Sequence, residues 1–221
     1  MNGAWRVERR AGAAGELHER AVDAGGRLVE LLEVVRPALV LGSRQSETEV
    51  DEVAAKATGI DVVRRRSGGG AVLLLPGRST WVDVTISRDD PLWTEDVAVA
   101  FHWLGAAWAD ALRSLGLDAS AHLGRAVETA WSRRVCFAGL GAGEIVVDGR
   151  KLVGISQRRT RDAARFQCLV NRSWDPVPIL GLLALTDDER VDALLSLASV
   201  GAGLDAPSER VLSALAASLP A

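Results

Sequence analysis

The sequence is poor in cysteine and histidine, and each shortage narrows the possible chemistry. Its two cysteines, Cys136 and Cys168, have neither the spacing of a zinc site nor that of a disulfide framework. Its three histidines are scattered without a metal-ligand motif. The first residues lack the apolar core of a signal peptide, and no apolar window is long enough for a membrane span. We therefore expect a cytoplasmic protein that binds no metal and does not enter a membrane.

Length and composition fit a single globular unit. The chain has 221 residues, of which 48% are hydrophobic and 25% charged, as expected for one core with at most a small appendage. Its formal net charge of -3 conceals basic clusters at 64–66, 133–134 and 158–161. These clusters form no extended stripe, so they favour an anionic small molecule or an acidic protein partner over nucleic acid.

Lysine is also rare, because arginine fills all but two of the 26 basic positions. Lys151 lies in the segment VVDGRKLVG at 146–154 and stands directly after an arginine. An ammonium is a compact point charge on a flexible stem, which a guanidinium cannot replace at a single oxygen atom. Lys151 is therefore a candidate for chemistry, although its retention by chance is an alternative.

A glycine-rich segment, RRRSGGGAV, occupies residues 64–72. Apolar stretches on both sides predict two strands joined by a bend, in which three glycines let the backbone lie against a ligand. Their amide groups can converge on an anion, with the arginines adding charge. The segment is neither a P-loop nor a dinucleotide fingerprint, since no Gly-Lys-Ser/Thr and no helix follow. A plain hairpin turn with solvated arginines is the alternative.

Hydrophobic periodicity places strands in the middle of the chain and helices towards both ends, which predicts an α+β fold with a central mixed or antiparallel sheet flanked by helices. The expected strands are 37–42, 60–64, 71–75, 80–86, 135–137, 144–147, 151–157 and 165–170. The expected helices are 16–34, 48–58, 95–115, 179–185, 187–197 and 207–218.

Some details of these elements can also be predicted. The alternation in 80–86 favours a sheet with one covered face. Thr94 should cap the helix 95–115, which ends at Gly116, and its Trp103 and Trp108 should pack in the core. The pair Asp148-Gly149 predicts a tight hairpin turn.

Two segments together carry a resemblance to a known family. RRRSGGGAV, followed later by VVDGRKLVGISQRR, is similar to motifs of the lipoate–protein ligase A family, which has the biotin/lipoate protein ligase fold and includes octanoyltransferases. The early segment PALVLGSRQS at 37–46 resembles the same family. The resemblance covers residues 16–175. It implies a catalytic domain at 1–175 and a helical C-terminal tail at 176–221 that packs on the same domain.

The family implies an enzyme that activates lipoate or octanoate with ATP and Mg²⁺ as an acyl-adenylate. The acyl group then moves to a lysine of a lipoyl-acceptor domain. Lys151 would be catalytic, contacting both the acyl carbonyl and the phosphate, where a cation stabilises the developing charges. Aliphatic side chains, including Leu152, could bury the chain of the acid. The residues implied to bind nucleotide and acyl group are Arg65, Ser67, Gly68, Gly69, Gly70, Ala71, Val72, Leu73, Gly154 and Ser156.

The sequence departs from the ligases in two places, which leaves alternatives open. Leu73-Leu74-Leu75-Pro76 replaces a histidine after the glycine motif, and Phe166-Gln167-Cys168 replaces a His-Gly element. An octanoyltransferase would need no ATP and would move octanoate from acyl carrier protein through a thioester on Cys136, which precedes Phe137 as in one branch of the family. No base for Cys136 can be named from the sequence. A catalytically inactive protein that binds an acyl-adenylate or a lipoyl domain is the third possibility. A monomer is expected in each case.

Overall fold

A large mixed sheet forms the centre of the fold in the computed structural model, which describes residues 4–22 and 25–221. Its strand order is β1-β2-β6-β10-β9-β8-β7, with β1 and β2 parallel and the other neighbours antiparallel. The predicted α+β class is therefore confirmed. Residues 1–3 lie outside the described residues. They belong to the N-terminal segment in which no signal-peptide core was expected. The seven strands are β1 (Arg6–Gly12), β2 (Leu28–Val34), β6 (Ser79–Ser87), β7 (Ala119–Ala121), β8 (Ile145–Val147), β9 (Arg150–Arg159) and β10 (Ala163–Asn171).

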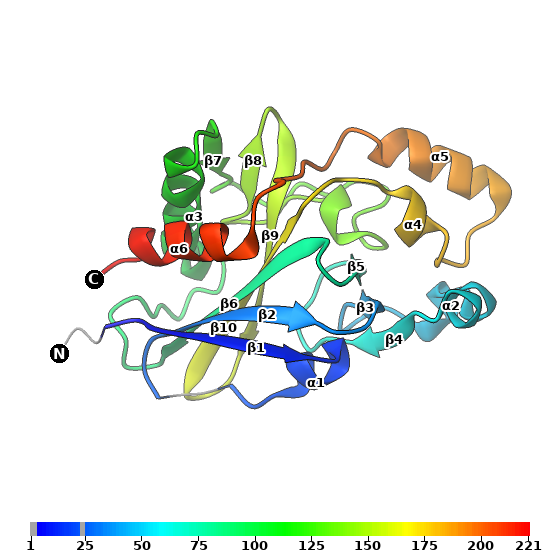
Figure 1. Ribbon diagram of the computed structural model, residues 1–221. Coiled ribbons are helices and arrows are strands. Elements are labelled where there is room, and N and C mark those ends of the chain that lie inside the picture. The colour runs from blue at the N-terminus through cyan, green and yellow to red at the C-terminus, as the bar shows by residue number, and fades with distance from the viewer. Residues whose placement is uncertain (1–3, 23–24) are drawn as a thin grey trace.

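A smaller sheet with the order β4-β3-β5 lies beside the large one (Figure 1). It consists of β3 (Ala38–Leu41), β4 (Asp61–Arg64) and β5 (Val72–Leu74). The α-helices are α1 (Ala14–Glu19), α2 (Glu52–Thr58), α3 (His102–Ser114), α4 (Val177–Leu180), α5 (Asp187–Leu197) and α6 (Ser208–Ser218). The 3-10 turns are η1 (Glu47–Glu49), η2 (Val99–Phe101) and η3 (Cys136–Ala138).

Alternation along β10 shows how the two faces of the large sheet differ. Phe166 and Cys168 are fully buried in a cluster with residues of α3 and α6, which cover one face (Figure 1). Arg165 and Gln167 point the other way and bond to residues of α1. Side chains on neighbouring positions of a strand face opposite sides, so one face carries an apolar core and the other a polar interior.

Most of the predicted strands are confirmed, but the expected helix at 16–34 is wrong. Its first part is α1, residues 23–24 lie outside the described residues, and Leu28–Val34 is the strand β2. The first five residues of β2 are buried, since the strand lies inside the sheet between β1 and β6. A strand buried on both faces shows no alternation, and its leucines imitate helical spacing. The edge strand β1 was missed because five of its seven residues are exposed.

Four further predictions need correction. Both faces of β6 are covered, because Asp83 and Thr85 are buried along with the apolar positions. Residues 135–137 form no strand, since Ala138 N–H bonds to Val135 O and closes the turn η3. The helix expected at 95–115 begins later, because the Asp96 carboxylate accepts the amides of residues 98 and 99 and leads into η2 and then α3. The helix expected at 179–185 is only the short α4.

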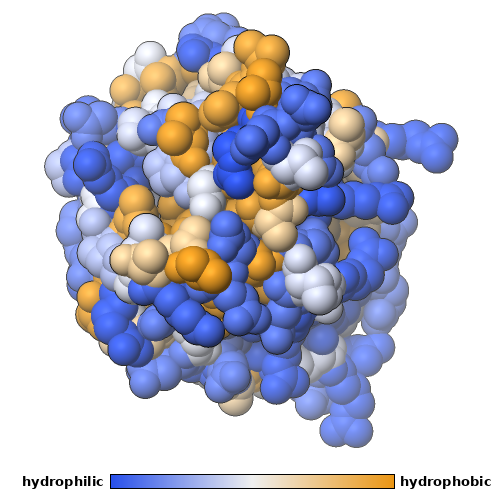
Figure 2. All heavy atoms as spheres, turned by 90° about the vertical axis from the view of Figure 1, so that its right-hand side faces the viewer, coloured by the Kyte–Doolittle hydropathy of each residue, from blue (hydrophilic) through white to orange (hydrophobic). Residues whose placement is uncertain are grey.

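The C-terminal helices pack on both sides of the molecule. α6 contacts α3, β2 and β6, whereas α5 and α4 cover the side next to the small sheet. Figure 2 views that side and shows apolar atoms reaching a surface that is otherwise mostly hydrophilic. Within residues 4–22 and 25–221, none of the helices combines the length and apolarity needed to cross a bilayer.

The division of the chain into a catalytic domain at 1–175 and a helical tail at 176–221 stays a prediction.

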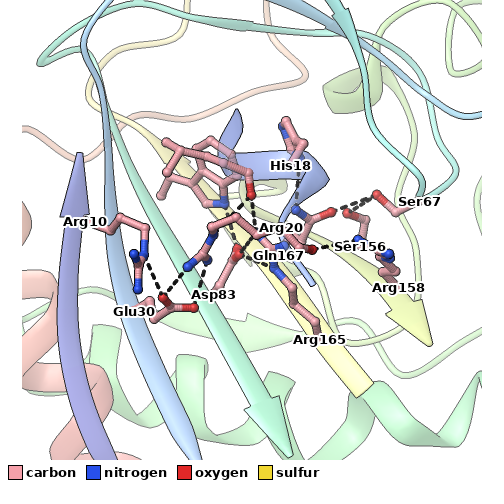
Figure 3. Close-up of polar contacts among 12 residues, drawn as sticks. Arg10, His18, Arg20, Glu30, Ser67, Asp83, Ser156, Arg158, Arg165 and Gln167 are labelled. Atoms are coloured by element: carbon pink, nitrogen blue, oxygen red, sulfur yellow. Dashed lines mark hydrogen bonds and ion pairs between the residues drawn. The ribbon is translucent and has the colours of Figure 1, made fainter. Parts of the chain in front are cut away.

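A network of buried charges fills the polar face of the large sheet (Figure 3). Asp83 and Arg165 form an ion pair whose side chains are 0% and 2% exposed, and Arg165 also donates to Leu17 O. Next to it, Glu30 accepts hydrogen bonds from Arg20 at 2.6 and 2.9 Å. Burial alone would raise the pKa of Glu30, but the Arg20 guanidinium holds the pKa below its usual value. The network joins β2, β6 and β10 to the α1 region through ion pairs, in which each buried charge is compensated by its partner.

We expect Arg165→Met to lower the free energy of unfolding by about 3–5 kcal/mol, because it leaves the Asp83 carboxylate buried without its cation. Urea denaturation measures the change. The double variant Arg165→Met with Asp83→Leu should recover most of the loss, since no unpaired charge then remains. A double variant as unstable as the single one would contradict this explanation.

Candidate active site

The bend Ser67–Gly70 connects β4 to β5 without forming a hairpin, because β3 lies between these two strands. The chain therefore crosses over the end of β3. The buried Arg65 guanidinium donates to Gly68 O and Gly70 O, both at 2.8 Å, and fixes the path of the bend. Gly69 has a φ of 95°, which favours glycine. The alternative of a plain hairpin is thus wrong. Of its arginines, Arg65 is buried and Arg66 is exposed.

The backbone amides of the bend are free to receive a ligand. In the described part of the chain, the N–H groups of Gly68, Gly69 and Gly70 donate to no acceptor. All three glycines line an open cavity of about 720 Å³, which we call the outer cavity. Amides without partners at a cavity wall are donors suited to an anion or to an oxygen that becomes negative during a reaction.

Cys136 lies against this bend because the backbones there come into direct contact. Ala71 N–H bonds to Arg134 O at 2.9 Å, and Cys136 N–H bonds to Ala71 O at 3.0 Å. A β-carbon on Gly69 would lie 2.9 Å from Arg65 Nη2 and 3.8 Å from Cys136 Sγ, so these two groups flank the same glycine. The thiol therefore lies next to free amides and a guanidinium.

Lys151 reaches the same place from the start of β9. The predicted Asp148-Gly149 turn is confirmed, with φ values of 50° and 72°, and it directs the chain into β9. Lys151 Nζ lies 2.7 Å from Glu144 Oε2 and donates to Cys136 O at 3.0 Å and to Gly139 O at 3.1 Å. Its backbone is bonded to Val200 O and to Ala202 N–H, both at 2.8 Å. The side chain thus links the Cys136 turn to the large sheet.

The ammonium of Lys151 stays charged in this buried position. Burial alone would lower the pKa of Lys151, but the Glu144 carboxylate and the nearby Cys136 raise it above its usual value. Glu144 is itself held in place by Gly141 N–H at 2.6 Å and Ile155 N–H at 3.0 Å. An ammonium has three hydrogens, and all three have partners here.

A second, narrower space lies behind Cys136, and we call it the inner slot. It measures about 40 Å³ and runs over β9, β10 and β6 beneath β5 and α1. Its walls are mostly apolar, so a chain of methylene groups could be buried there once the side chains move apart. The lining residues are His18, Arg65, Val72, Leu74, Trp81, Cys136, Phe137, Gly154, Ile155, Ser156, Gln167, Cys168 and Leu169.

Several predicted site residues meet at these two spaces. Cys136, Ile155 and Ser156 line both, so Cys136 stands at the boundary between the outer cavity and the inner slot. Ser67 Oγ lies 3.0 Å from Ser156 Oγ and joins the bend to β9. The residues that line at least one of the two spaces are Arg65, Gly68, Gly69, Gly70, Val72, Cys136, Lys151, Gly154 and Ser156.

Three predicted residues lie elsewhere. Ala71 and Leu73 line a separate cavity next to α4, and Leu152 packs in the core with α3. Leu73 is displaced because side chains alternate along β5, which brings Leu74 to the inner slot in its place. Sequence reasoning missed Glu144, whose partner Lys151 becomes its neighbour only across the β8–β9 hairpin.

His18 was also missed, since a lone histidine on a short helix gives no signal in the sequence. The residue is 5% exposed, and its ring packs tilted against Trp81, with 4.5 Å between centroids and 32° between the ring planes. Its Nδ1 lies 3.0 Å from Gln167 Nε2. Burial, together with the charges of Arg65 and Arg165, lowers the pKa of His18 to about 3. The ring is therefore neutral at physiological pH.

The two cysteines differ sharply. Burial raises the pKa of the Cys168 thiol, whose residue is 0% exposed and sits under the sheet next to α3. A thiol must ionise to act as a nucleophile, so Cys168 is unsuited to that role. Cys136 is partly exposed and borders the outer cavity.

Sequence comparisons point to acyl-transfer enzymes. The sequence model of the lipoyl protein ligase A/B catalytic domain matches residues 16–205. The octanoyltransferase LipM of Kyrpidia tusciae is 32% identical over 195 residues, which cover 81% of this chain and 69% of that protein. The octanoyltransferase LipM of Geobacillus kaustophilus is 32% identical over 131 residues, or 57% of this chain, and the match spans about half of that relative, 46%.

Solved structures share the fold. A bipartite lipoate protein ligase from Thermoplasma acidophilum, described together with its E2 lipoyl domain, aligns over 97% of this chain and 82% of its own. Its TM-score is 0.74 and its identity 18%. A lipoate-protein ligase A bound with ATP aligns over 97% of this chain and 83% of its own, with a TM-score of 0.68 and 22% identity. At these identities the likeness concerns the fold alone.

The low pKa of His18 predicts a measurable pH dependence of stability. The pKa of a histidine in the unfolded chain is about 6.5. Below that pH the unfolded state binds a proton at His18, whereas the folded state binds it only near pH 3. The stabilising contribution is complete above pH 6.5 and is lost as the pH falls towards 3. The loss is at most about 1.4 kcal/mol per pH unit. Urea denaturation of wild type and His18→Gln between pH 7 and pH 4 should give diverging curves, and parallel curves would contradict the shift.

Proposed function

Because the chain belongs to the lipoyl protein ligase A/B catalytic domain family, we propose that it is an acyltransferase that carries a medium-chain acyl group as a thioester on Cys136. Family membership confirms the expected lipoate ligase-like fold and an enzyme of the ligase or transferase type. The proposal selects the transferase among the readings that the sequence left open. Curated relatives named as octanoyltransferases support it.

The position of Cys136 is the observation that carries the proposal. Its thiol lies between a polar cavity with three free amides and a slot with apolar walls. A thioester formed there would place its carbonyl oxygen near the amides and its hydrocarbon tail in the slot. The cationic side chains of Arg65 and Lys151 both interact with Cys136.

The reaction then proceeds in two acyl transfers. The Cys136 thiolate attacks the carbonyl carbon of an octanoyl thioester on a carrier, and the amides of the bend stabilise the oxygen while it is negative. The bond to the carrier sulfur breaks, and the carrier leaves with the proton that Cys136 lost. In the second transfer the amine of an acceptor lysine attacks the Cys136 thioester. An amide forms, the bond to Cys136 breaks, and the amine proton returns to the thiol.

An ATP-dependent ligase fits the site less well. Lys151 would have to bridge an acyl oxygen and a phosphate, but its three hydrogens are used by Glu144, Cys136 O and Gly139 O. Glu144, the buried carboxylate at the outer cavity, is committed to Lys151 and so is not free to hold Mg²⁺. These contacts support a role for Lys151 in holding the Cys136 turn and supplying positive charge.

Two arginines in the lining of the outer cavity suit acidic protein partners. Arg44 and Arg133 line the cavity together with Glu49 and Glu128, and the exposed Arg133 guanidinium lies 3.9 Å from the Glu128 carboxylate. Exposed cations around an entrance attract acidic partners and speed their encounter. We propose that the donor is an acyl carrier protein and that the acceptor is a lipoyl-acceptor domain.

The thioester step is tested by intact mass after incubation with octanoyl carrier protein. Wild type should gain one octanoyl group on Cys136 without ATP, and an added apo lipoyl domain should remove it. Cys136→Ser should lose transfer by at least about 10³-fold, as expected when a nucleophile is removed. Cys168→Ala is the matched cysteine control: because Cys168 also lines the inner slot, the rate can fall, but the octanoyl group should still be found on Cys136. Activity that requires ATP and survives Cys136→Ser would replace the transferase with a ligase.

The role of Lys151 requires a variant that leaves no buried charge unpaired. Lys151→Ala strands the Glu144 carboxylate, so loss of stability would obscure the kinetics. Lys151→Met combined with Glu144→Gln removes both charges while keeping their volumes. We expect this pair to fold and to lower the rate of Cys136 acylation roughly 10²-fold, because the positive charge near the thiolate is gone. Unchanged acylation in the folded double variant would show that the ammonium serves the fold only.

A further inference from the structure

A further pocket opens on the polar face of the large sheet, and we call it the sheet pocket. Residues of β1, β2, β6 and β10 line it together with the end of the α1 region, among them Glu8, Arg10, Arg20, Glu30, Thr85 and Arg165. None of its lining residues lines the outer cavity or the inner slot. It measures about 210 Å³, several times the roughly 30 Å³ that one water molecule takes up in the liquid. The sheet pocket therefore has room for a group larger than water.

Two neighbouring side chains in the sheet pocket have hydrogen-bond donors without acceptors. Nε and Nη2 of Arg165 face the Asp83 carboxylate, and Nη2 also donates to Leu17 O. Nη1 is buried and has no partner among the residues that the structure describes. Thr85 pairs with Arg165 across β6 and β10, so both side chains lie on the same face of the sheet. Thr85 is 2% exposed, and within residues 4–22 and 25–221 its hydroxyl forms no hydrogen bond.

The carboxylates next to these donors are already used by other groups (Figure 3). Glu30 accepts from Arg20 with both oxygens, at 2.6 and 2.9 Å, and its Oε1 also accepts from Arg10 at 3.4 Å. Asp83 accepts from Arg165 with Oδ2 and from an indole N–H with Oδ1. A polar group inside a folded protein normally has a partner, so the donors of the sheet pocket call for an acceptor from outside the chain.

Positive charge is in excess around the sheet pocket. Four guanidinium groups, of Arg10, Arg20, Arg158 and Arg165, share this face of the sheet with three carboxylates, of Glu8, Glu30 and Asp83. Arg158 lies opposite Arg165 on β9, forms no ion pair in the described part of the chain, and donates to Arg20 O at 2.9 Å. Like charges on opposite positions of two strands repel each other. Glu8 is partly exposed and lies 3.8 Å from Arg10, so it leaves the charge at Arg165 uncompensated. An anion relieves this repulsion, whereas water does not.

We propose that the sheet pocket binds a small oxyanion, a carboxylate or a phosphate group, which accepts hydrogen bonds from Arg165 Nη1 and from the Thr85 hydroxyl. The partly exposed Arg10 adds positive charge to the pocket. The bound anion lies beside Arg165 and Arg20, which both donate to Leu17 O, and so strengthens the attachment of α1 to the sheet. The site is independent of the proposed acyl transfer, because it shares no lining residue with the spaces around Cys136.

Calorimetry tests the site with inorganic phosphate and with acetate, each titrated into the protein at constant ionic strength. Wild type should bind at least one of the two anions saturably. Thr85→Val removes the hydroxyl without changing any charge and should weaken this binding roughly tenfold, because a hydrogen bond to a charged group is lost. Arg165 is left intact, since its removal would strand Asp83.

A second pair of variants separates the site from the net charge of the protein. Arg10→Gln removes a cation of the sheet pocket and should weaken the binding. Arg113→Gln removes the same charge from an exposed ion pair with Asp110 on α3 and should bind like wild type.

Each outcome supports or overturns the inference. Binding of phosphate alone or of acetate alone supports it and identifies the class of oxyanion, and binding of both shows that the shared charge is recognised. If neither anion binds saturably, the sheet pocket holds only water and the inference is overturned. Equal affinities of wild type and Thr85→Val would also overturn it, since the anion would then lie elsewhere, such as at the glycine bend. Equal losses in Arg10→Gln and Arg113→Gln would reduce the effect to net charge and overturn it as well.

Discussion

The site depends on a backbone contact that leaves no room for a side chain. A β-carbon on Gly70 would lie 2.7 Å from both the nitrogen and the carbonyl carbon of Val135, well inside van der Waals contact. Two hydrogen bonds on either side of Ala71 then fasten residues 134 and 136 to the bend. Because of this contact, the Cys136 thiol, the free amides and the entrance to the slot share one small region. Any larger residue at position 70 would separate them.

Buried charges fix the surroundings of that contact. Arg65 holds the bend through carbonyl oxygens, and Lys151 with Glu144 holds the turn that carries Cys136. On the same face of the sheet, Asp83 and Arg165 anchor α1, the helix that carries His18. Such groups are costly to bury singly but stable when each has its partner, so they specify one arrangement of the loops.

Local signals in the sequence predicted the parts of the site that are local in the chain. The glycine segment, the Asp148-Gly149 turn and Lys151 at the start of β9 could all be found, because each depends on neighbouring residues. Glu144 and His18 could not, since their roles arise only when distant segments meet. β2 was misread as helix because its burial on both faces removed the alternation that marks a strand. Leu73 was expected at the site from the family resemblance, whereas alternation along β5 turns Leu74 to the inner slot.

One feature of Lys151 reaches beyond the catalytic centre. Its main chain is hydrogen-bonded to Val200 and Ala202, residues that follow α5. The segment 200–202 therefore holds the start of β9, the strand that positions the ammonium, through two backbone hydrogen bonds. The backbone that positions the Lys151 ammonium is thus bonded to the C-terminal part of the chain, so the Cys136 turn and the segment after α5 share one support.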